Sequence, residues 1–240
     1  MMKRVLVVLA VVAMLVTLVG CTSSGGGAGL ALGPVPWQDG EKVSYDWVTK
    51  SNNQNVGTSD FTFAKSGSNW VLGFTDNLTS LNQTAQVTAD GTTLKPLSEE
   101  KTLRATATDG TVTNAKLNTT YSGGKLNISV VVNGETKTAS VDVPSDALDN
   151  DQLLMTLRAL KYTNGYQGQV TVMSGQNALK IPTTVRVLNQ ESVTVPKGTF
   201  NCWKLELDFG QGKQNVWYQV DAPNNLVQYD NGGGLMVWAR

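Results

Sequence analysis

From Pro34 to the C-terminus, apolar and polar residues alternate along short segments, and turn residues separate these segments. Successive side chains of a β-strand point to opposite faces of the sheet, so this pattern predicts antiparallel strands with one apolar face. We expect about a dozen strands at a spacing of roughly 8–12 residues, which is typical of a meander, a barrel or a sandwich. The clearest apolar sets are Val43, Tyr45 and Trp47; Phe61 and Phe63; Trp70, Leu72 and Phe74; Leu126, Ile128, Val130 and Val132; and Trp203, Leu205, Leu207 and Phe209.

Dipeptides that favour tight turns lie between several of these segments. Asp90-Gly91, Asp109-Gly110 and Asn133-Gly134 each predict a hairpin with a type I′ turn. Ser122-Gly123-Gly124-Lys125 is a similar break. The predicted strands therefore follow one another as hairpins.

One segment has the pattern of an amphipathic helix. Asp149 is a candidate N-cap, with Gln152 three residues later, and Asn164-Gly165 is a stop signal. Arg158 and Lys161 fall in the last turns, where a cation favours the helix dipole. The apolar stripe consists of Leu153, Leu154, Leu157 and Leu160. In a chain of antiparallel strands, we expect this stripe to pack on the concave face of the sheet.

The first 20 residues have the organisation of a secretory signal. Lys3 and Arg4 precede an apolar run from Val5 to Val19, which is shorter than a membrane-spanning helix needs. The run ends in Leu18-Val19-Gly20-Cys21, which resembles the lipobox of bacterial lipoproteins. This resemblance implies that residues 1–20 are removed and that Cys21 carries the lipid. The alternatives are an ordinary secretory signal or an N-terminal anchor helix with an incidental cysteine.

These signals give a domain plan and a location. Residues 21–33 are the expected lipidated cysteine and a flexible Gly/Ser tether, and residues 34–240 are a single β-rich domain. A two-domain alternative with a boundary near Pro144 lacks a low-complexity linker on either side. We expect a protein of the cell envelope, anchored to a membrane by its lipid and facing away from the cytoplasm.

Composition excludes several classes of function. Lys+Arg and Asp+Glu both number 19, so the chain has no basic excess that would favour a nucleic-acid partner. The chain contains no histidine, which excludes Ser-His-Asp and Cys-His catalysis and histidine-ligated zinc within this chain. We therefore expect no enzyme activity, no cofactor and no metal site.

The C-terminal third carries the most specific order of motifs. Leu157-Arg158-Ala159-Leu160 is followed by Pro196-Lys197-Gly198-Thr199-Phe200 and by Trp217-Tyr218 with Ala222-Pro223. This order resembles a periplasmic family of unknown function related to the LolA/LolB-like lipoprotein carriers. The resemblance implies a mainly β fold: a strongly curved antiparallel sheet, forming an incomplete barrel, with one helix on its concave side. It also implies a hydrophobic groove, but it identifies no ligand.

Tryptophans on the predicted strands and leucines of the predicted helix are the candidate ligand-binding residues. Ligand sites are mostly apolar, with a few polar groups. The alternative is that these side chains pack in an ordinary core. The candidates are Trp47, Trp70, Leu153, Leu157, Trp203 and Trp217.

Other reactive residues have simpler interpretations. Cys202 has no histidine to activate it, and Ser122-x-x-Lys125 lies in a predicted turn rather than at a helix start. Glu206 and Asp208 share one strand face, which is usually solvated, although paired carboxylates also hydrolyse sugars. Four aspartates precede or begin the helix without EF-hand spacing: Asp142, Asp146, Asp149 and Asp151. Helix capping and compensation of the helix dipole explain Asp149 and Asp151.

Three functional hypotheses follow. The first is a lipoprotein that binds a hydrophobic ligand or a lipid-like envelope component on the concave face of its sheet. The second is a structural lipoprotein that binds another envelope protein through an exposed face or a sheet edge. The third is an enzyme acting on cell-wall sugars through Glu206 and Asp208.

Overall fold

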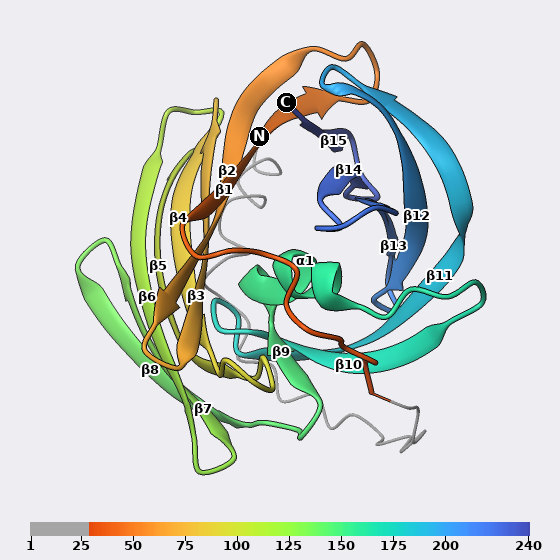
Figure 1. Cartoon of the computed structure of the whole chain (residues 1–240). Helices are drawn as coiled ribbons and strands as arrows, with labels where there is room; N and C mark the ends of the chain where they lie inside the picture. The colour runs from red at the N-terminus through yellow and green to blue at the C-terminus, as the bar shows by residue number, and fades with distance from the viewer. Residues whose placement is uncertain (1–28) are drawn as a thin grey trace.

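The computed structural model describes residues 29–240, and their strands form one curved sheet (Figure 1). The sheet has 15 strands in the order β8-β7-β6-β5-β4-β3-β2-β1-β15-β14-β13-β12-β11-β10-β9. The first eight strands are β1 (Glu41–Thr49), β2 (Asn55–Ser66), β3 (Asn69–Leu78), β4 (Leu81–Ala89), β5 (Pro96–Thr106), β6 (Val112–Ser122), β7 (Lys125–Val132) and β8 (Glu135–Asp142). The others are β9 (Ala147–Asp149), β10 (Gln167–Ser174), β11 (Leu179–Val195), β12 (Gly198–Asp208), β13 (Lys213–Gln219), β14 (Leu226–Asp230) and β15 (Leu235–Ala239).

The strands form a meander in which the first and last strands of the chain are paired. Each strand pairs with its neighbour in sequence except at β8 and β9, and β15 pairs antiparallel with β1. Strands β9 and β10 are the one parallel pair in the described part of the chain. Because β8 and β9 are not paired with each other, the sheet curves into a barrel that does not close. The predicted mainly β fold, an incomplete barrel with one short helix, is confirmed.

The helical segment lies inside the curved sheet in Figure 1. It consists of three short pieces: η2 (Asn150–Gln152), α1 (Leu153–Thr156) and η3 (Leu157–Ala159). Asp149 caps it as predicted, since its carboxylate accepts a hydrogen bond from the Asp151 N–H at 2.9 Å. The helix ends before the predicted stop, because Leu160 is extended and pairs with Leu32.

The apolar stripe of the helix joins two packed regions of the sheet interior. Leu153, Leu157 and Leu160 belong to the core built by the strands from β10 to β15 and by β1. Met155 and Ala159, on another side, pack against Phe63 and Trp70 of β2 and β3. The helix therefore fills the middle of the barrel, as the prediction of a buried stripe requires.

The segment that precedes β1 is ordered against the helix. We call residues 29–39 the strap. The Gly33 N–H donates to the Ala159 carbonyl at 2.7 Å, and the Lys161 N–H donates to the Ala31 carbonyl at 2.9 Å. The predicted flexible tether is thus wrong for residues 29–33, because the extended backbone after η3 offers them hydrogen-bond partners. The predicted signal peptide and the lipid attachment at Cys21 lie outside the described residues.

Only one of the three predicted type I′ turns has the φ angles that this turn type requires at both central residues. Asn133 and Gly134 both have positive φ, 49° and 91°, as a type I′ turn requires. At Asp109-Gly110 only the glycine does, and at Asp90-Gly91 neither does. The Asp90 carboxylate instead accepts from the Thr92 and Thr93 N–H groups, which produces a longer loop.

Within residues 29–240, no helix has the length and apolar character needed to span a membrane.

Candidate functional site

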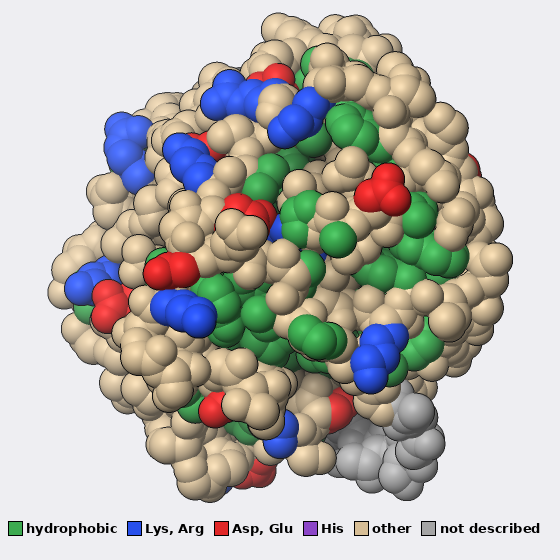
Figure 2. All heavy atoms as spheres, in the orientation of Figure 1, with side chains coloured by type: hydrophobic (Ala, Val, Ile, Leu, Met, Phe, Trp, Pro, Cys, Tyr) green, Lys and Arg blue, Asp and Glu red, His purple; other side chains and the backbone are tan. Residues whose placement is uncertain are grey.

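The two ends of the barrel differ. At the end where β1 begins, the strap crosses in front of α1 (Figure 1), and we call this the closed end. Trp37 of the strap stacks on Phe63 with ring centroids 5.0 Å apart and meets the edge of Trp70 at 6.0 Å. In the same view, Figure 2 shows apolar side chains gathered across the middle of this face. The strap therefore serves as part of the core at this end.

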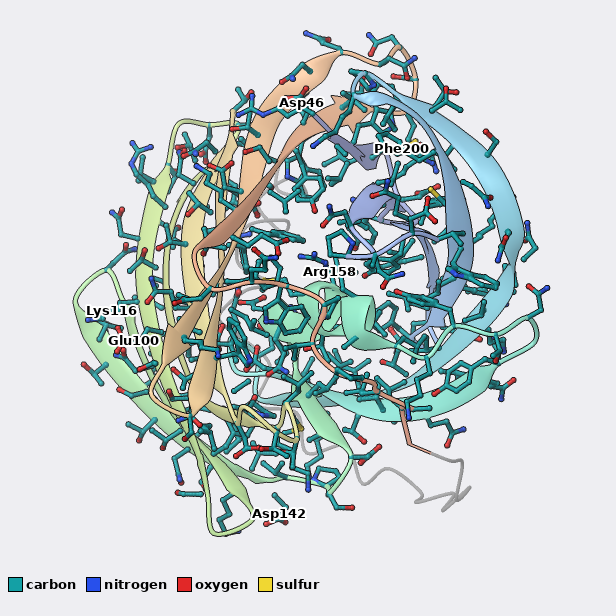
Figure 3. All side chains as sticks on the ribbon, viewed as in Figure 1. Asp46, Glu100, Lys116, Asp142, Arg158 and Phe200 are labelled. Carbon is teal, nitrogen blue, oxygen red and sulfur yellow. The ribbon has the colours of Figure 1, made fainter. Side chains whose placement is uncertain are left out.

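Arg158 lies inside the closed end, where Figure 3 shows it within the sheet. Its side chain is only 1% exposed and lies 2.8 Å from Glu41, although the pair lacks the alignment of a hydrogen bond. Its guanidinium also donates to the Pro223 carbonyl at 3.1 Å and lies 4.7 Å from the centre of the Phe63 ring. Arg158 lies in the last turn of the helical segment, as predicted, and its partners Glu41 and Pro223 also hold it there.

The opposite end, where β1 ends, contains a cavity of about 900 Å³. We call this the open end, because its rim carries exposed residues such as Leu179, Gln211 and Gly232. One wall comes from β1 to β3, the second from the start of the helix, and the third from strands between β11 and β15. The main apolar side chains that line it are Trp47, Phe61, Phe74, Leu154, Leu207 and Tyr229.

A short polar chain interrupts the apolar wall of β1 to β3. The Trp47 indole N–H donates to Ser59 Oγ at 2.5 Å, and the Ser59 hydroxyl donates to Asp76. Gln83 Nε2 donates to the other Asp76 oxygen at 2.7 Å. Asp76 is 6% exposed, and this burial raises the pKa of its carboxyl above the usual value even though its hydrogen bonds lower it. The cavity thus has one polar position in an aromatic wall.

A second polar position lies at the start of the helix. Asn150 and Asp151 line the cavity beside Leu153. Asp151 forms an ion pair with Lys101 at 2.7 Å, and both side chains are less than a tenth exposed. The charge of Asp151 is therefore balanced within the protein.

Behind Asp151 lies a buried acidic cluster formed by Glu99, Asp149 and Asp151, whose oxygens come within 4.8 Å of one another. The Tyr121 hydroxyl donates to Asp149 at 2.6 Å. Burial, with the nearby charge of Asp149, raises the pKa of Glu99 to about 11. Burial and the charge of Asp151 raise the pKa of Asp149 to about 7. Burial opposes ionisation of Asp151, but the charge of Lys101 together with hydrogen bonds from Glu99, Lys101 and Asn150 outweighs it and holds the pKa of Asp151 low.

These shifts indicate how the cluster is neutralised. Glu99 keeps its proton at neutral pH and shares it with the Asp151 carboxylate, while Lys101 supplies one positive charge. Carboxylate oxygens at this spacing are also the ligands that Ca²⁺ prefers. The Lys101 ammonium already occupies an Asp151 oxygen, which compensates the charge of that carboxylate. The sequence predicted only that Asp149 and Asp151 are capping residues. The structure confirms this for Asp149.

The structure separates the six predicted ligand-binding residues. Trp47 and Leu153 line the cavity. Trp70 and Leu157 are buried in the core, and Trp203 stacks on Tyr162 with ring centroids 6.0 Å apart.

Trp217 lies opposite Lys204 in the β12–β13 register, on the sheet face that is opposite to Leu205. Its indole N–H donates to Glu191 at 2.6 Å, and Lys204 Nζ lies 5.2 Å from its ring centre. Trp217 therefore does not line the cavity. Alternation identifies the apolar face of a strand, but it does not show which tryptophans meet around an empty space.

Sequence reasoning missed Asp76. The signal was present, because Asp76 has the same phase as the apolar residues Trp70, Leu72 and Phe74 on β3. Glu99 and Lys101 likewise have the inward phase of β5, while Glu100 points outward (Figure 3). A charged residue at an inward position of a strand is the informative pattern.

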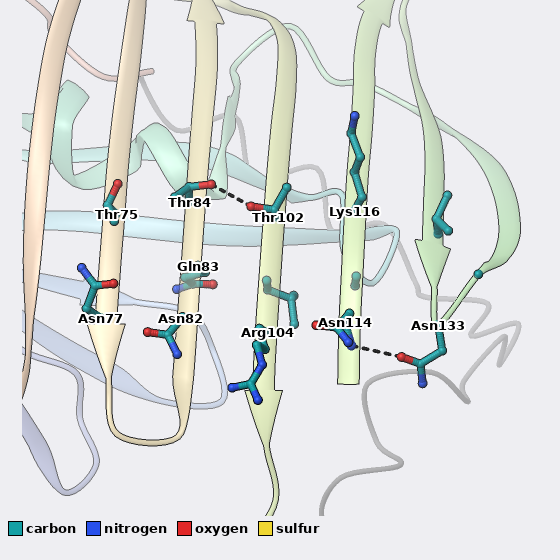
Figure 4. Close-up of a pocket in the computed structure, with 14 residues that line it drawn as sticks. Thr75, Asn77, Asn82, Gln83, Thr84, Thr102, Arg104, Asn114, Lys116 and Asn133 are labelled. Atoms are coloured by element: carbon teal, nitrogen blue, oxygen red, sulfur yellow. Dashed lines mark hydrogen bonds between the residues drawn. The ribbon is translucent and has the colours of Figure 1, made fainter. Parts of the chain in front are cut away.

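A separate hollow of about 480 Å³ lies across strands β3 to β7, on the face opposite to the core (Figure 4). Hydrogen bonds link neighbouring side chains here, such as Thr84 to Thr102 at 2.8 Å. Arg104 and Lys116 add positive charge, and no carboxylate lines the hollow. Its chemistry is that of a solvated, hydrogen-bonding surface.

The remaining reactive residues are held in structural contacts. Arg186 Nη1 lies 2.8 Å from Glu206 and 3.1 Å from Asp208, and Lys213 lies 3.0 Å from Glu206. Hydrogen bonds from the Gly210 N–H and Arg186 hold the pKa of Asp208 below its usual value. Burial raises the pKa of the Cys202 thiol to about 12, so this cysteine stays protonated.

Ser122 and Lys125 flank a hairpin turn, as predicted. Lys125 pairs with Asp142 at 2.6 Å.

Comparisons with known proteins support the fold and give a family. No curated protein matches the chain. A β-barrel-like protein of the DUF1849 family from Brucella abortus superposes with a TM-score of 0.54 and 11% identity, covering 83% of this chain and 94% of that one. A protein with a YmcC-like fold from Bacteroides fragilis gives a TM-score of 0.31 and 12% identity over 88% and 97% of the two chains.

At these identities, the first likeness concerns the fold alone, and the second carries no argument. The resemblance to the LolA/LolB-like carriers stays a prediction. Residues 42–229, most of the described chain, match a family described as "Protein of unknown function (DUF3108)". The chain belongs to the DUF3108 family.

Proposed function

We propose that this protein is a lipid-anchored binding protein of the bacterial cell envelope that holds a hydrophobic or amphiphilic ligand in the cavity of its open end. The observation that carries the proposal is the cavity itself, about 900 Å³ with mainly aromatic and aliphatic walls. Ligand pockets usually measure about 300–1,000 Å³ and combine apolar walls with a few polar groups. A protein core at normal packing density would leave no such space.

The sequence before the strap supports the anchor. Leu18-Val19-Gly20-Cys21 resembles a lipobox, and it follows a signal-length apolar run. The strap, residues 29–39, follows this sequence in the chain and packs at the closed end, and none of its residues lines the cavity. The role that we propose is binding, without catalysis.

Ligand capture tests the proposal. The full-length precursor is expressed in bacteria, purified in a mild detergent and analysed by native mass spectrometry, and bound molecules are then extracted. We expect a non-covalent apolar adduct in addition to the mass of the lipidated chain. Leu154→Trp, which fills the cavity from the helix, should remove the adduct.

Leu188→Trp is the matched control, because Leu188 is an exposed leucine of β11 away from the cavity. It should keep the adduct. A wild-type protein that carries no adduct, and that takes up neither added lipids nor an apolar dye, would contradict the proposal.

A second candidate function rests on the free edge of the sheet. Among the strands of residues 29–240, β8 has a paired neighbour on one side only, and its residues from Glu135 to Ser140 are exposed. Such an edge accepts a partner strand by β-addition. Crosslinking from β8 in cells that recovers one envelope protein, together with an empty cavity, would favour this function over ligand binding.

A further inference from the structure

We infer that the cavity of the open end selects an amphiphile with a cationic, hydrogen-bond-donating head group, such as a primary amine, and that Asp76 anchors this head. This inference rests on the proposed function and specifies its ligand class. The argument starts from the charges that face the cavity.

Among the described residues, two carboxyl groups line the cavity, and only Asp151 has an ion-pair partner. Asp151 is paired with Lys101 at 2.7 Å. Asp76, within the part of the chain that the structure describes, has no ion pair, and the Lys101 ammonium, which is bound to Asp151, acts on it only through its weaker field. Its hydrogen bonds come from the neutral groups of Ser59 and Gln83.

The unfilled positions of Asp76 are available to a ligand. A carboxylate offers about four acceptor positions, and Ser59 and Gln83 each take one. Burial of a carboxylate without a cation costs free energy, so a cation bound at this point would stabilise the folded protein. Because Asp76 is 6% exposed and lines the cavity, a bound head group would reach it from within the cavity.

The surroundings of Asp76 suit an ammonium group. Phe74 lies two residues earlier on the same face of β3, where its ring already has the Lys101 ammonium 5.6 Å from its centre, and Trp47 joins Asp76 through Ser59. The Trp47 ring meets Tyr229 edge-on at 6.5 Å across the cavity wall. Aromatic faces attract alkylammonium groups, most strongly where water is excluded. The leucines on the opposite walls, such as Leu154 and Leu207, would contact the alkyl chain.

An anionic head group lacks these partners. At Asp76 it would meet a negative charge in a region of low dielectric. The lysines at the rim are Lys180 and Lys213, and Lys213 already pairs with Glu206 at 3.0 Å. An anionic amphiphile would therefore depend on Lys180 at the rim. The preference for a cationic or an anionic head group thus shows whether the head binds at Asp76 or at Lys180.

Three ligands with one chain length test the inference: dodecylamine, dodecanol and dodecanoate. Each displaces a neutral apolar dye from the purified full-length protein, at concentrations below micelle formation. We expect the wild type to bind the amine about ten- to a hundredfold more tightly than the alcohol, the range for a charge-assisted hydrogen bond, and the dodecanoate most weakly.

Asp76→Asn is the test variant. It should lose the preference for the amine while binding the dye and the alcohol as the wild type does. Asp60→Asn is the matched control, because Asp60 pairs with Lys42 on the other face of β2, next to Ser59 in sequence. This control should keep the wild-type selectivity.

The outcomes separate this inference from the proposed function. A wild type that binds the dye and the alcohol but shows no preference for the amine, or prefers dodecanoate, overturns the inference and leaves the proposed function standing. Unchanged amine preference in Asp76→Asn overturns the role of Asp76. If the wild type binds none of the probes, the proposed function itself fails.

Discussion

The closed end and the open end of the barrel use the same kinds of side chain to different effect. At the closed end, Trp37 of the strap covers Phe63 and Trp70, and Arg158 finds both an anion and a carbonyl. At the open end, no segment within residues 29–240 covers the aromatic wall, and Asp76 forms no ion pair with any of these residues. Aromatic lining therefore does not distinguish a core from a binding site. A core differs from a binding site in two other ways: a segment of the chain covers its aromatic side chains, and its buried charged groups have partners.

The largest expected effect is at Arg158. Arg158→Ala should lower the free energy of unfolding by about 3–5 kcal/mol, because it removes buried packing and leaves Glu41 and the Pro223 carbonyl without their partner. Urea denaturation measures this. The control Arg104→Ala, on the exposed outer face, should change stability by less than about 0.5 kcal/mol. Equal effects of the two substitutions would show that the partners of Arg158 add no stability, which would remove this difference between the closed end and the open end.

Removing the strap anchor should come next. Trp37→Ala is expected to cost about 3 kcal/mol, since it empties a buried aromatic position against Phe63 and Trp70. It should also speed proteolysis within residues 29–39, which mass spectrometry of the fragments detects. Trp203→Ala, at a partly exposed tryptophan of β12, should leave cleavage of the strap unchanged. Cleavage elsewhere in place of the strap would contradict its role as the cover.

The acidic cluster behind the open end gives a pH effect of intermediate size. Glu99 has a folded pKa of about 11 against an ordinary 4.5, so the folded state holds a proton that the unfolded state releases. Its contribution to stability is complete below about pH 4.5 and is lost as the pH rises toward 11. Glu99→Gln imitates the protonated form, and we expect it to raise stability by about 1–3 kcal/mol at pH 8.

At pH 4.5 Glu99→Gln should match the wild type, which denaturant titrations at both pH values will show. Glu100→Gln, on the outer face of the same strand, is the control and should have no such pH-dependent effect. A stability gain of equal size at both pH values would exclude the proposed proton on Glu99.

The smallest expected effect compares enlargement at the two ends. Leu154→Trp should change stability by less than about 1 kcal/mol, because the added ring enters existing space. Ala159→Leu adds a smaller volume at the closed end, where Ala159 is buried beside Trp37, and should cost about 1–3 kcal/mol. Thermal unfolding of the two variants in parallel sharpens the comparison. If Leu154→Trp lowered stability more than Ala159→Leu does, the cavity would not have room for the added ring.

Part of this comparison was readable from the residues. The alternation of β3 predicted that Trp70 and Leu72 point inward, and the Asp149 cap placed the start of the helix. Both signals are local, since they depend on neighbours within a few positions. The destination of Arg158 was not readable, because its partners Glu41 and Pro223 come from distant parts of the chain.

The cavity also depended on long-range contacts. It forms where β1 to β3 face strands that lie more than a hundred residues later, and pairing of β15 with β1 brings these halves together.

The sequence alone determined the mainly β class, the faces of the strands, the single buried helical stripe and the absence of histidine chemistry. Each follows from residue type and spacing. Tertiary structure decided that the strap covers one end, that residues 29–240 leave the other end hollow, and that Asp76 is a buried acid with no ion pair among these residues. The physical reason is that a cavity and an unpaired charge are properties of what surrounds a residue, and those surroundings come from segments that only the folded sheet brings together.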